Sequence, residues 1–192
     1  MAGKESTLKN MVLSLFIISL VASVALGYVY EFTKGPIEVA KAAKVNDAIK
    51  AVVPACDNNP SAEVYKVAYE KDTLNVYPAK KGGQLVGAAV ETYTEKGFGG
   101  HISLMVGFLP DGTINDIAVV SHHETPGLGD KMEKAKSNFS LQFMGKNPKD
   151  FKLMVKKDGG DVDAITASTI SSRAFCDAVT RAYNAFMKGG AK

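Results

Sequence analysis

The sequence is poor in cysteine, has no tryptophan and carries little net charge. Its 2 cysteines are too few for a four-cysteine iron–sulfur or zinc site. Cys56 and Cys176 could form one bridge or a buried thiol pair, and without a Cys-x-x-Cys motif a redox role is disfavoured. The 23 basic and 20 acidic side chains leave a net charge of +3, too small to indicate a nucleic-acid-binding surface. A Walker-type Gly-Lys pair and a strand-to-helix Gly-x-Gly-x-x-Gly turn are missing, which disfavours nucleotide hydrolysis and Rossmann-type dinucleotide binding.

Residues 11–30 form an apolar run of 20 residues without a charged side chain. At about 1.5 Å per residue, a helix of this length spans about 30 Å, the thickness of the hydrocarbon core of a bilayer. The run has no amphipathic period, so a helix buried in a soluble core is a poor alternative. We expect a single transmembrane helix in the inner (cytoplasmic) membrane. Lys4 and Lys9 favour placing residues 1–10 in the cytoplasm.

A cleaved signal peptide is the competing interpretation of this segment. Ser23-Val24-Ala25 resembles a small-x-small cleavage site. The apolar run continues past that site, however, and Tyr28, Tyr30 and Phe32 follow at its far end, where aromatic side chains mark a membrane interface. These features favour a retained anchor.

After the anchor, the pattern predicts a helical connector over residues 31–60 and one compact α+β domain over residues 61–192 on the extracytoplasmic side. In the connector, Glu38–Val53 suits a helix that ends at Pro54. In the domain, β-rich segments predict an antiparallel sheet, and apolar residues at helical spacing predict a C-terminal helix that starts near Ser171 or Ser172. The other expected elements are strands near residues 64–67, 74–77, 85–93, 101–108, 114–121 and 151–155, a turn at 110–112 and a short helix over 130–135.

Two segments of the domain are rich in glycine or hydroxyl groups. The first, residues 121–131, reads SHHETPGLGDK and is a shaped loop after a strand. A metal site there would use His122, His123 and Glu124, with His101 as a further ligand. Adjacent histidines in a strand point to opposite faces, so joint ligation is awkward. We expect no metal site and no catalytic residue.

The second segment, residues 161–172, reads DVDAITASTISS and lies directly before the C-terminal helix. Free amide groups and the helix dipole attract anions to such a place, so a phosphate could bind there. The simpler alternative is an N-cap formed by Ser171 or Ser172, which needs only one hydroxyl group.

Together the two segments resemble a known family. HHETPGLGDKM is similar to the His-x-Glu-Thr-Pro-Gly-Leu-Gly-Asp-Lys loop of the FMN-binding domain in the G subunit of the Rnf electron-transport complex. DGGDVDAITASTISSRA resembles the flavin-attachment segment of the same family, and the single N-terminal anchor is also a family feature. The C subunit of the sodium-translocating NADH:quinone reductase shares this domain, but the length of the chain fits the Rnf protein better.

The resemblance implies a covalent flavin. In the family, the FMN phosphate forms a phosphoester with the threonine that closes the attachment segment, which is Thr169 in this sequence. A separate flavin transferase would install the group from FAD with a divalent cation. The remaining expected cofactor-binding residues are Glu124, Thr125, Gly127, Leu128, Gly129, Lys131, Thr166, Ala167, Ser168, Ile170 and Ser171. The first five would line the isoalloxazine ring, residues 166–171 would hold the phosphate, and Lys131 would offset charge on the reduced flavin.

One departure from the family pattern concerns the attachment segment. The family has Gly and Ala where this chain has Ala167 and Ser168. Glycine often supplies a positive φ, and alanine in that conformation costs about 1 kcal/mol or more. Ser168 also offers a competing hydroxyl group, so it is the fallback attachment site.

The implied function is that of an electron-carrying component of an ion-translocating oxidoreductase. The partners would be the other Rnf subunits, in a complex that passes electrons between ferredoxin and NAD and couples this to sodium or proton transport. The alternatives are the quinone-reductase C subunit, a membrane-anchored flavin-binding sensory or regulatory domain, and a secreted binding module without a cofactor.

Overall fold

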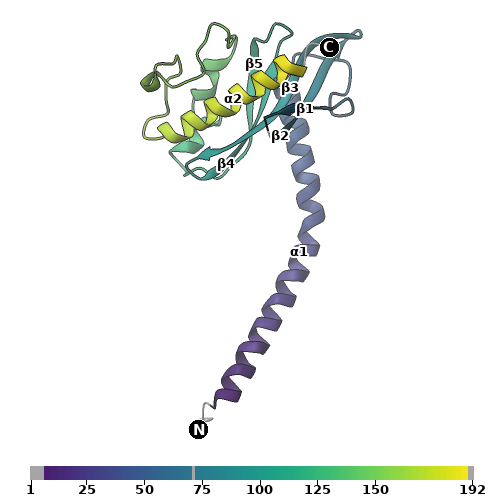
Figure 1. The fold of residues 1–192 in the computed structure, drawn as a ribbon. Coiled ribbons are helices and arrows are strands. Elements are labelled where there is room, and N and C mark those ends of the chain that lie inside the picture. The colour runs from purple at the N-terminus through teal and green to yellow at the C-terminus, as the bar shows by residue number, and fades with distance from the viewer. Residues whose placement is uncertain (1–6, 71, 190–192) are drawn as a thin grey trace. The chain divides into compact units, whose positions relative to one another are not determined.

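A computed structural model describes residues 7–70 and 72–189 (Figure 1). The chain divides into two units, residues 7–43 and residues 44–189. The helices and strands are α1 (Leu8–Val52), β1 (Tyr65–Tyr69), β2 (Asp72–Lys81), β3 (Gln84–Gly97), β4 (Gly100–Phe108), β5 (Ile114–His122) and α2 (Thr169–Gly189). Three short 3-10 helices lie between β5 and α2, namely η1 (Gly129–Met132), η2 (Phe139–Phe143) and η3 (Lys156–Asp158). The architecture is α+β, as predicted.

Helix α1 is continuous over 45 residues and contains the whole apolar run. Its most apolar 18-residue window has a mean hydropathy of 2.4, and none of that window is buried. A helix of this length and composition is long and apolar enough to cross a membrane. It ends at Val52, two residues before Pro54, which cannot continue a helix.

Five antiparallel strands form one sheet in the order β1-β2-β3-β4-β5. The predicted turn is present, because the Leu109 amide donates to the Thr113 carbonyl oxygen at 2.8 Å and Gly112 has φ +87°. This turn joins β4 to β5, so the predicted hairpin is confirmed.

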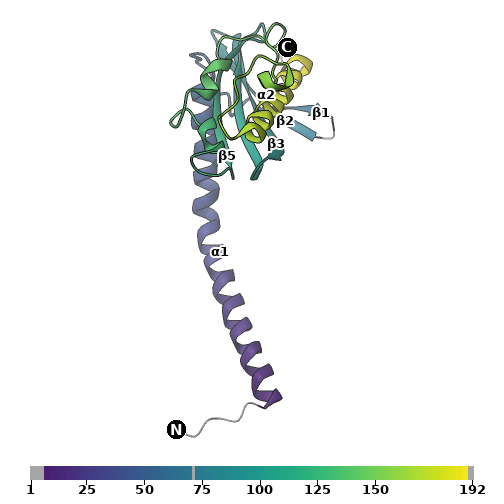
Figure 2. The same ribbon diagram turned by 90° about the vertical axis from the view of Figure 1, so that its left-hand side faces the viewer.

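Alternate side chains of the strands supply two separate apolar layers. On one face, Val90 and Leu104 belong to the main core with Phe175 and Val179 of α2, which lies along the sheet in both views (Figures 1 and 2). On the other face, Ala89 and Met105 pack with Ile49 and Val52, from the part of α1 that belongs to residues 44–189. Helix α2 is therefore fixed against the sheet along most of its length.

Three local expectations differ from the structure. Residues 151–155 are not a strand, because the amides of Phe151 and Lys152 bond to Asn147 and to the Asp161 side chain; only Val155 forms a single bridge, with Val162. The short helix predicted over 130–135 is the 3-10 turn η1. Helix α2 starts at Thr169, so Ser171 and Ser172 lie inside its first turn and neither is the N-cap.

Candidate functional site

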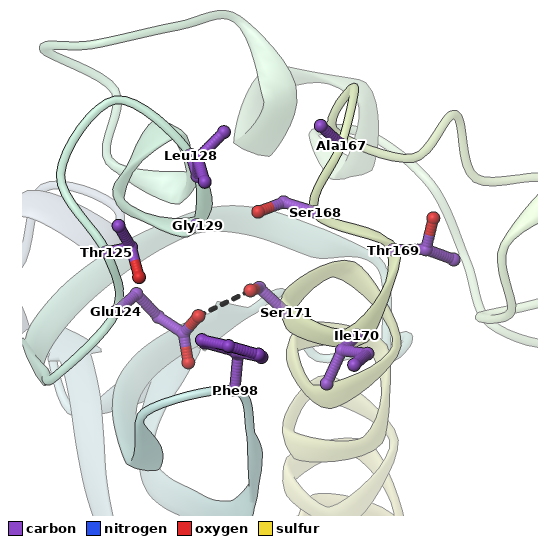
Figure 3. A pocket seen from close by; sticks show the side chains of 10 residues that line it. All are labelled: Phe98, Glu124, Thr125, Leu128, Gly129, Ala167, Ser168, Thr169, Ile170 and Ser171. Carbon is purple, nitrogen blue, oxygen red and sulfur yellow. Dashed lines mark hydrogen bonds between the residues drawn. The ribbon is translucent and has the colours of Figure 1, made fainter.

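A pocket of about 350 Å³ opens where three segments far apart in the sequence meet. Phe98 comes from the tip of the β3–β4 hairpin, the loop after β5 forms one wall, and the turn into α2 forms the other (Figure 3). Its volume falls within the range of small-molecule sites. The side chains of Phe98, Leu128 and Ile170 are 70%, 40% and 49% exposed, so the pocket offers uncovered apolar surface.

The carboxylate of Glu124 connects the three segments. It is only 6% exposed, and its Oε1 accepts a hydrogen bond from the Gly99 amide at 3.0 Å. Its Oε2 accepts a hydrogen bond from the Ser171 hydroxyl at 2.5 Å, drawn as the dashed line in Figure 3. A Cβ atom at Gly129 would lie 2.4 Å from Oε2, so glycine is required for this close approach.

The turn before α2 is fixed by the buried side chain of Ser172. Its Oγ accepts a hydrogen bond from the Ile165 amide at 2.9 Å and donates one to the Ser168 carbonyl oxygen at 3.0 Å. Within this turn Ala167 has φ +59°, the left-handed conformation that favours glycine. Ala167 therefore has the conformation for which the sequence predicted an energetic cost.

The loop after β5 has its own support. The His122 Nδ1 accepts a hydrogen bond from the Glu124 amide at 3.1 Å, and its Nε2 lies 2.8 Å from Glu133 Oε1. Asp130 is buried, and the Gly127 amide, followed by Lys136, holds the pKa of its carboxyl below the usual range. These contacts support the shape of the loop.

Nine of the twelve expected cofactor-binding residues line the pocket, namely Glu124, Thr125, Leu128, Gly129, Ala167, Ser168, Thr169, Ile170 and Ser171. Lys131 and Thr166 instead line a neighbouring hollow of about 410 Å³. Gly127 does not line the pocket, but its φ of +78° shapes the loop. The Ser171 hydroxyl is engaged by Glu124, so it serves the carboxylate rather than a phosphate in this arrangement.

Sequence reasoning missed Phe98. The signal that could have found it is the sequence Gly97-Phe98-Gly99-Gly100, in which a large aromatic side chain stands between glycines at a hairpin tip. Gly99 leaves room for the loop after β5, because a Cβ atom there would lie 1.9 Å from the His123 carbonyl oxygen. The hairpin tip and the loop therefore touch through their backbones.

No histidine or cysteine lines the pocket in the described part of the chain. His101 pairs with Glu95, and Nδ1 and Oε1 are 2.6 Å apart. Within residues 7–70 and 72–189, no three His, Cys, Asp or Glu side chains gather as a metal site would require. Cys56 and Cys176 are free thiols, so the single-bridge alternative is wrong, and burial raises the pKa of Cys176 to about 12.

The sequence of the chain is similar to those of known proteins. Residues 97–184 match the family model of the FMN-binding domain. The chain is similar to proteins of several bacteria that are named as the G subunit of an ion-translocating oxidoreductase complex. Identity is 34% over 171 residues with the Haemophilus influenzae protein (85% of this chain, 83% of the relative) and 34% over 185 residues with the Aliivibrio fischeri protein (90% and 86%). It is 42% over 132 residues with the Salmonella typhi protein (66% and 64%).

Proposed function

The chain belongs to the G-subunit family of the Rnf ion-translocating oxidoreductase complex and has its FMN-binding domain, and on this premise we propose that Thr169 carries a covalent FMN. The bond would be a phosphoester between the threonine Oγ1 and the phosphate. The observation that carries the proposal is the position of Thr169. It is the first residue of α2 and lines the pocket together with Phe98 of the β3–β4 hairpin and Leu128 of the loop after β5.

The residues of the pocket fit this group. A phosphate on Thr169 would lie at the positive end of a 21-residue helix, where amide groups and the helix dipole favour an anion. The exposed apolar side chains of Phe98, Leu128 and Ile170 offer contact surface for a flat ring system. Thr169 is half-buried, so its hydroxyl is open to modification, whereas the Ser168 side chain is buried. This difference favours Thr169 over Ser168.

The bound flavin would supply one- and two-electron redox chemistry, and the protein would supply attachment, orientation and electrostatics. Thr169 would be the attachment point and not a nucleophile that turns over. Glu124, Gly129 and Ser171 would hold the wall of the pocket in place. The chain would perform no substrate chemistry of its own.

The same proposal includes the setting of the protein. Helix α1 would span the inner membrane once, with the FMN-binding domain on the extracytoplasmic side, where a lost cofactor could not readily be replaced. A flavin transferase would load the domain. The relatives are named as G subunits, which favours an Rnf complex that exchanges electrons between ferredoxin and NAD over the quinone reductase that shares this domain.

The full chain co-expressed with a flavin transferase tests the proposal. Purified protein should absorb visible light as a flavin, and its band should remain fluorescent after denaturing electrophoresis. Mass spectrometry should place one FMN, less one water, on the peptide that contains Thr169. Flavin that is released completely on denaturation would contradict covalent attachment. Absence of flavin from the native protein would favour a binding module without a cofactor.

A further inference from the structure

Glu124 places a buried negative charge in the flavin pocket without a counter-ion. Its two hydrogen-bond donors, the Gly99 amide and the Ser171 hydroxyl, are both neutral. In the part of the chain that the structure describes, no lysine, arginine or histidine forms an ion pair with it. Burial of an unpaired charge is unfavourable, so the presence of Glu124 in the pocket wall indicates a role beyond packing.

No cationic side chain among the described residues of the pocket offsets this charge. Among the described residues, Glu124 is the only charged side chain that lines it. Lys131, which the sequence suggested as a compensating cation, lines the neighbouring hollow instead. Lys136 is engaged by Asp130 and Glu133, each at 3.1 Å. The nearby imidazole of His122 faces the Glu124 amide and Glu133, and does not bond to the Glu124 carboxylate.

We propose that the Glu124 carboxylate lowers the midpoint reduction potential of a flavin in this pocket, an inference that rests on the proposed function. Each electron that enters a neutral ring system adds one negative charge unless a proton accompanies it. A fixed negative charge beside the ring system opposes that addition. Because Glu124 is only 6% exposed, water screens its interaction less than it would screen that of a surface carboxylate. A flavin held at low potential passes its electrons readily to the next carrier.

The substitution Glu124→Gln separates charge from shape. Glutamine has the same size, its Oε1 can accept the Gly99 amide, and its Nε2 can donate to the Ser171 oxygen. The matched control is Glu63→Gln. It also removes a carboxylate of the same domain, but Glu63 pairs with Lys80 and does not line the pocket.

The measurement is a redox titration of the purified, flavin-loaded full chain with dithionite, followed by visible absorption. We expect Glu124→Gln to shift the reduction equilibrium at least tenfold toward the reduced flavin, which is about 59 mV for a one-electron couple. Glu63→Gln should match the wild type. Equal potentials in all three proteins would overturn the inference. A wild type without covalent flavin would instead contradict the proposed function.

A second variant covers the case in which Glu124→Gln does not take up flavin. Thr125→Lys leaves Glu124 and both of its hydrogen bonds in place and adds a cation at an exposed position of the pocket wall. It should raise the potential in the same direction. If Glu124→Gln folds but stays empty and Thr125→Lys leaves the potential unchanged, the role of Glu124 is to hold the shape of the pocket and the proposed charge effect is wrong.

Discussion

The hydroxyl of Ser172 donates a hydrogen bond to the carbonyl oxygen of Ser168 at 3.0 Å, so a residue inside the first turn of α2 closes the turn that precedes the helix. The hydroxyl oxygen of Ser172 also accepts a hydrogen bond from the Ile165 amide, and the Ser172 side chain is fully buried. Thr169 lies between these two serines. Its position at the pocket therefore depends on a hydrogen-bonded turn and not on a flexible loop.

The first prediction concerns this turn. Ser172→Ala should lower the free energy of unfolding by about 1–3 kcal/mol, because it leaves the buried Ile165 amide without an acceptor. The matched control is Thr180→Val in the same helix. The Thr180 hydroxyl donates only to the Cys176 carbonyl oxygen four residues earlier, so its loss should cost less than about 0.5 kcal/mol. Urea unfolding of both variants measures the difference, and equal losses would contradict the assigned role.

The second prediction concerns the left-handed residue of the turn. Relief of backbone strain in Ala167→Gly should exceed the greater entropy of the unfolded chain, with a net gain of about 0.5–1 kcal/mol. Ala164→Gly is the control, because Ala164 is exposed in the same segment and is not among the residues with positive φ. It should lose stability. Thermal or urea unfolding measures the stability of both variants. A loss of stability in Ala167→Gly would show that this conformation carries no strain.

The third prediction concerns acid stability. The Arg173 guanidinium donates to both carboxylate oxygens of Asp158, at 2.6 and 2.7 Å, and holds the pKa of that carboxyl below its usual range. A lowered native pKa stabilises the fold above the ordinary carboxyl pKa of about 4, and this contribution disappears as the pH falls through the native value. Unfolding midpoints from pH 7 to 2 should therefore fall less steeply in Asp158→Asn than in the wild type. Parallel curves would contradict the assigned pair.

The two loops of the site could be found from the sequence because their chemistry is local. Hydroxyl groups before an amphipathic helix and a Pro-Gly loop after a strand are visible in the order of residues. The β-branched residues Ile117, Val119 and Val120, which follow the turn at 110–112, are enough to predict β5. The left-handed conformation of Ala167 was anticipated from the glycine that the family has at that position.

Long-range placement could not be predicted in the same way. Phe98 lines the pocket because the neighbouring Gly99 amide donates a hydrogen bond to Glu124, 25 residues later in the sequence. No local sequence pattern predicts that contact. Phe151 and Leu153 pack against the core, but residues 151–155 form only the single bridge of Val155 with Val162, so the prediction of a strand from this apolar run is wrong. The sequence offers Ser171 or Ser172 as an N-cap only as an alternative to a phosphate site, and each instead has a tertiary role that depends on the folded turn.

Thr169 provides the most direct test of the account. The full chain and the variants Thr169→Val, Thr169→Ser and Ser168→Ala would each be co-expressed with a flavin transferase. Each protein would then be denatured and examined for flavin fluorescence of its band. Loss of the hydroxyl in Thr169→Val should abolish the fluorescence, while Ser168→Ala should retain it and Thr169→Ser should retain part of it. Unchanged fluorescence in Thr169→Val would contradict the central claim, and loss in Ser168→Ala alone would move the attachment to Ser168.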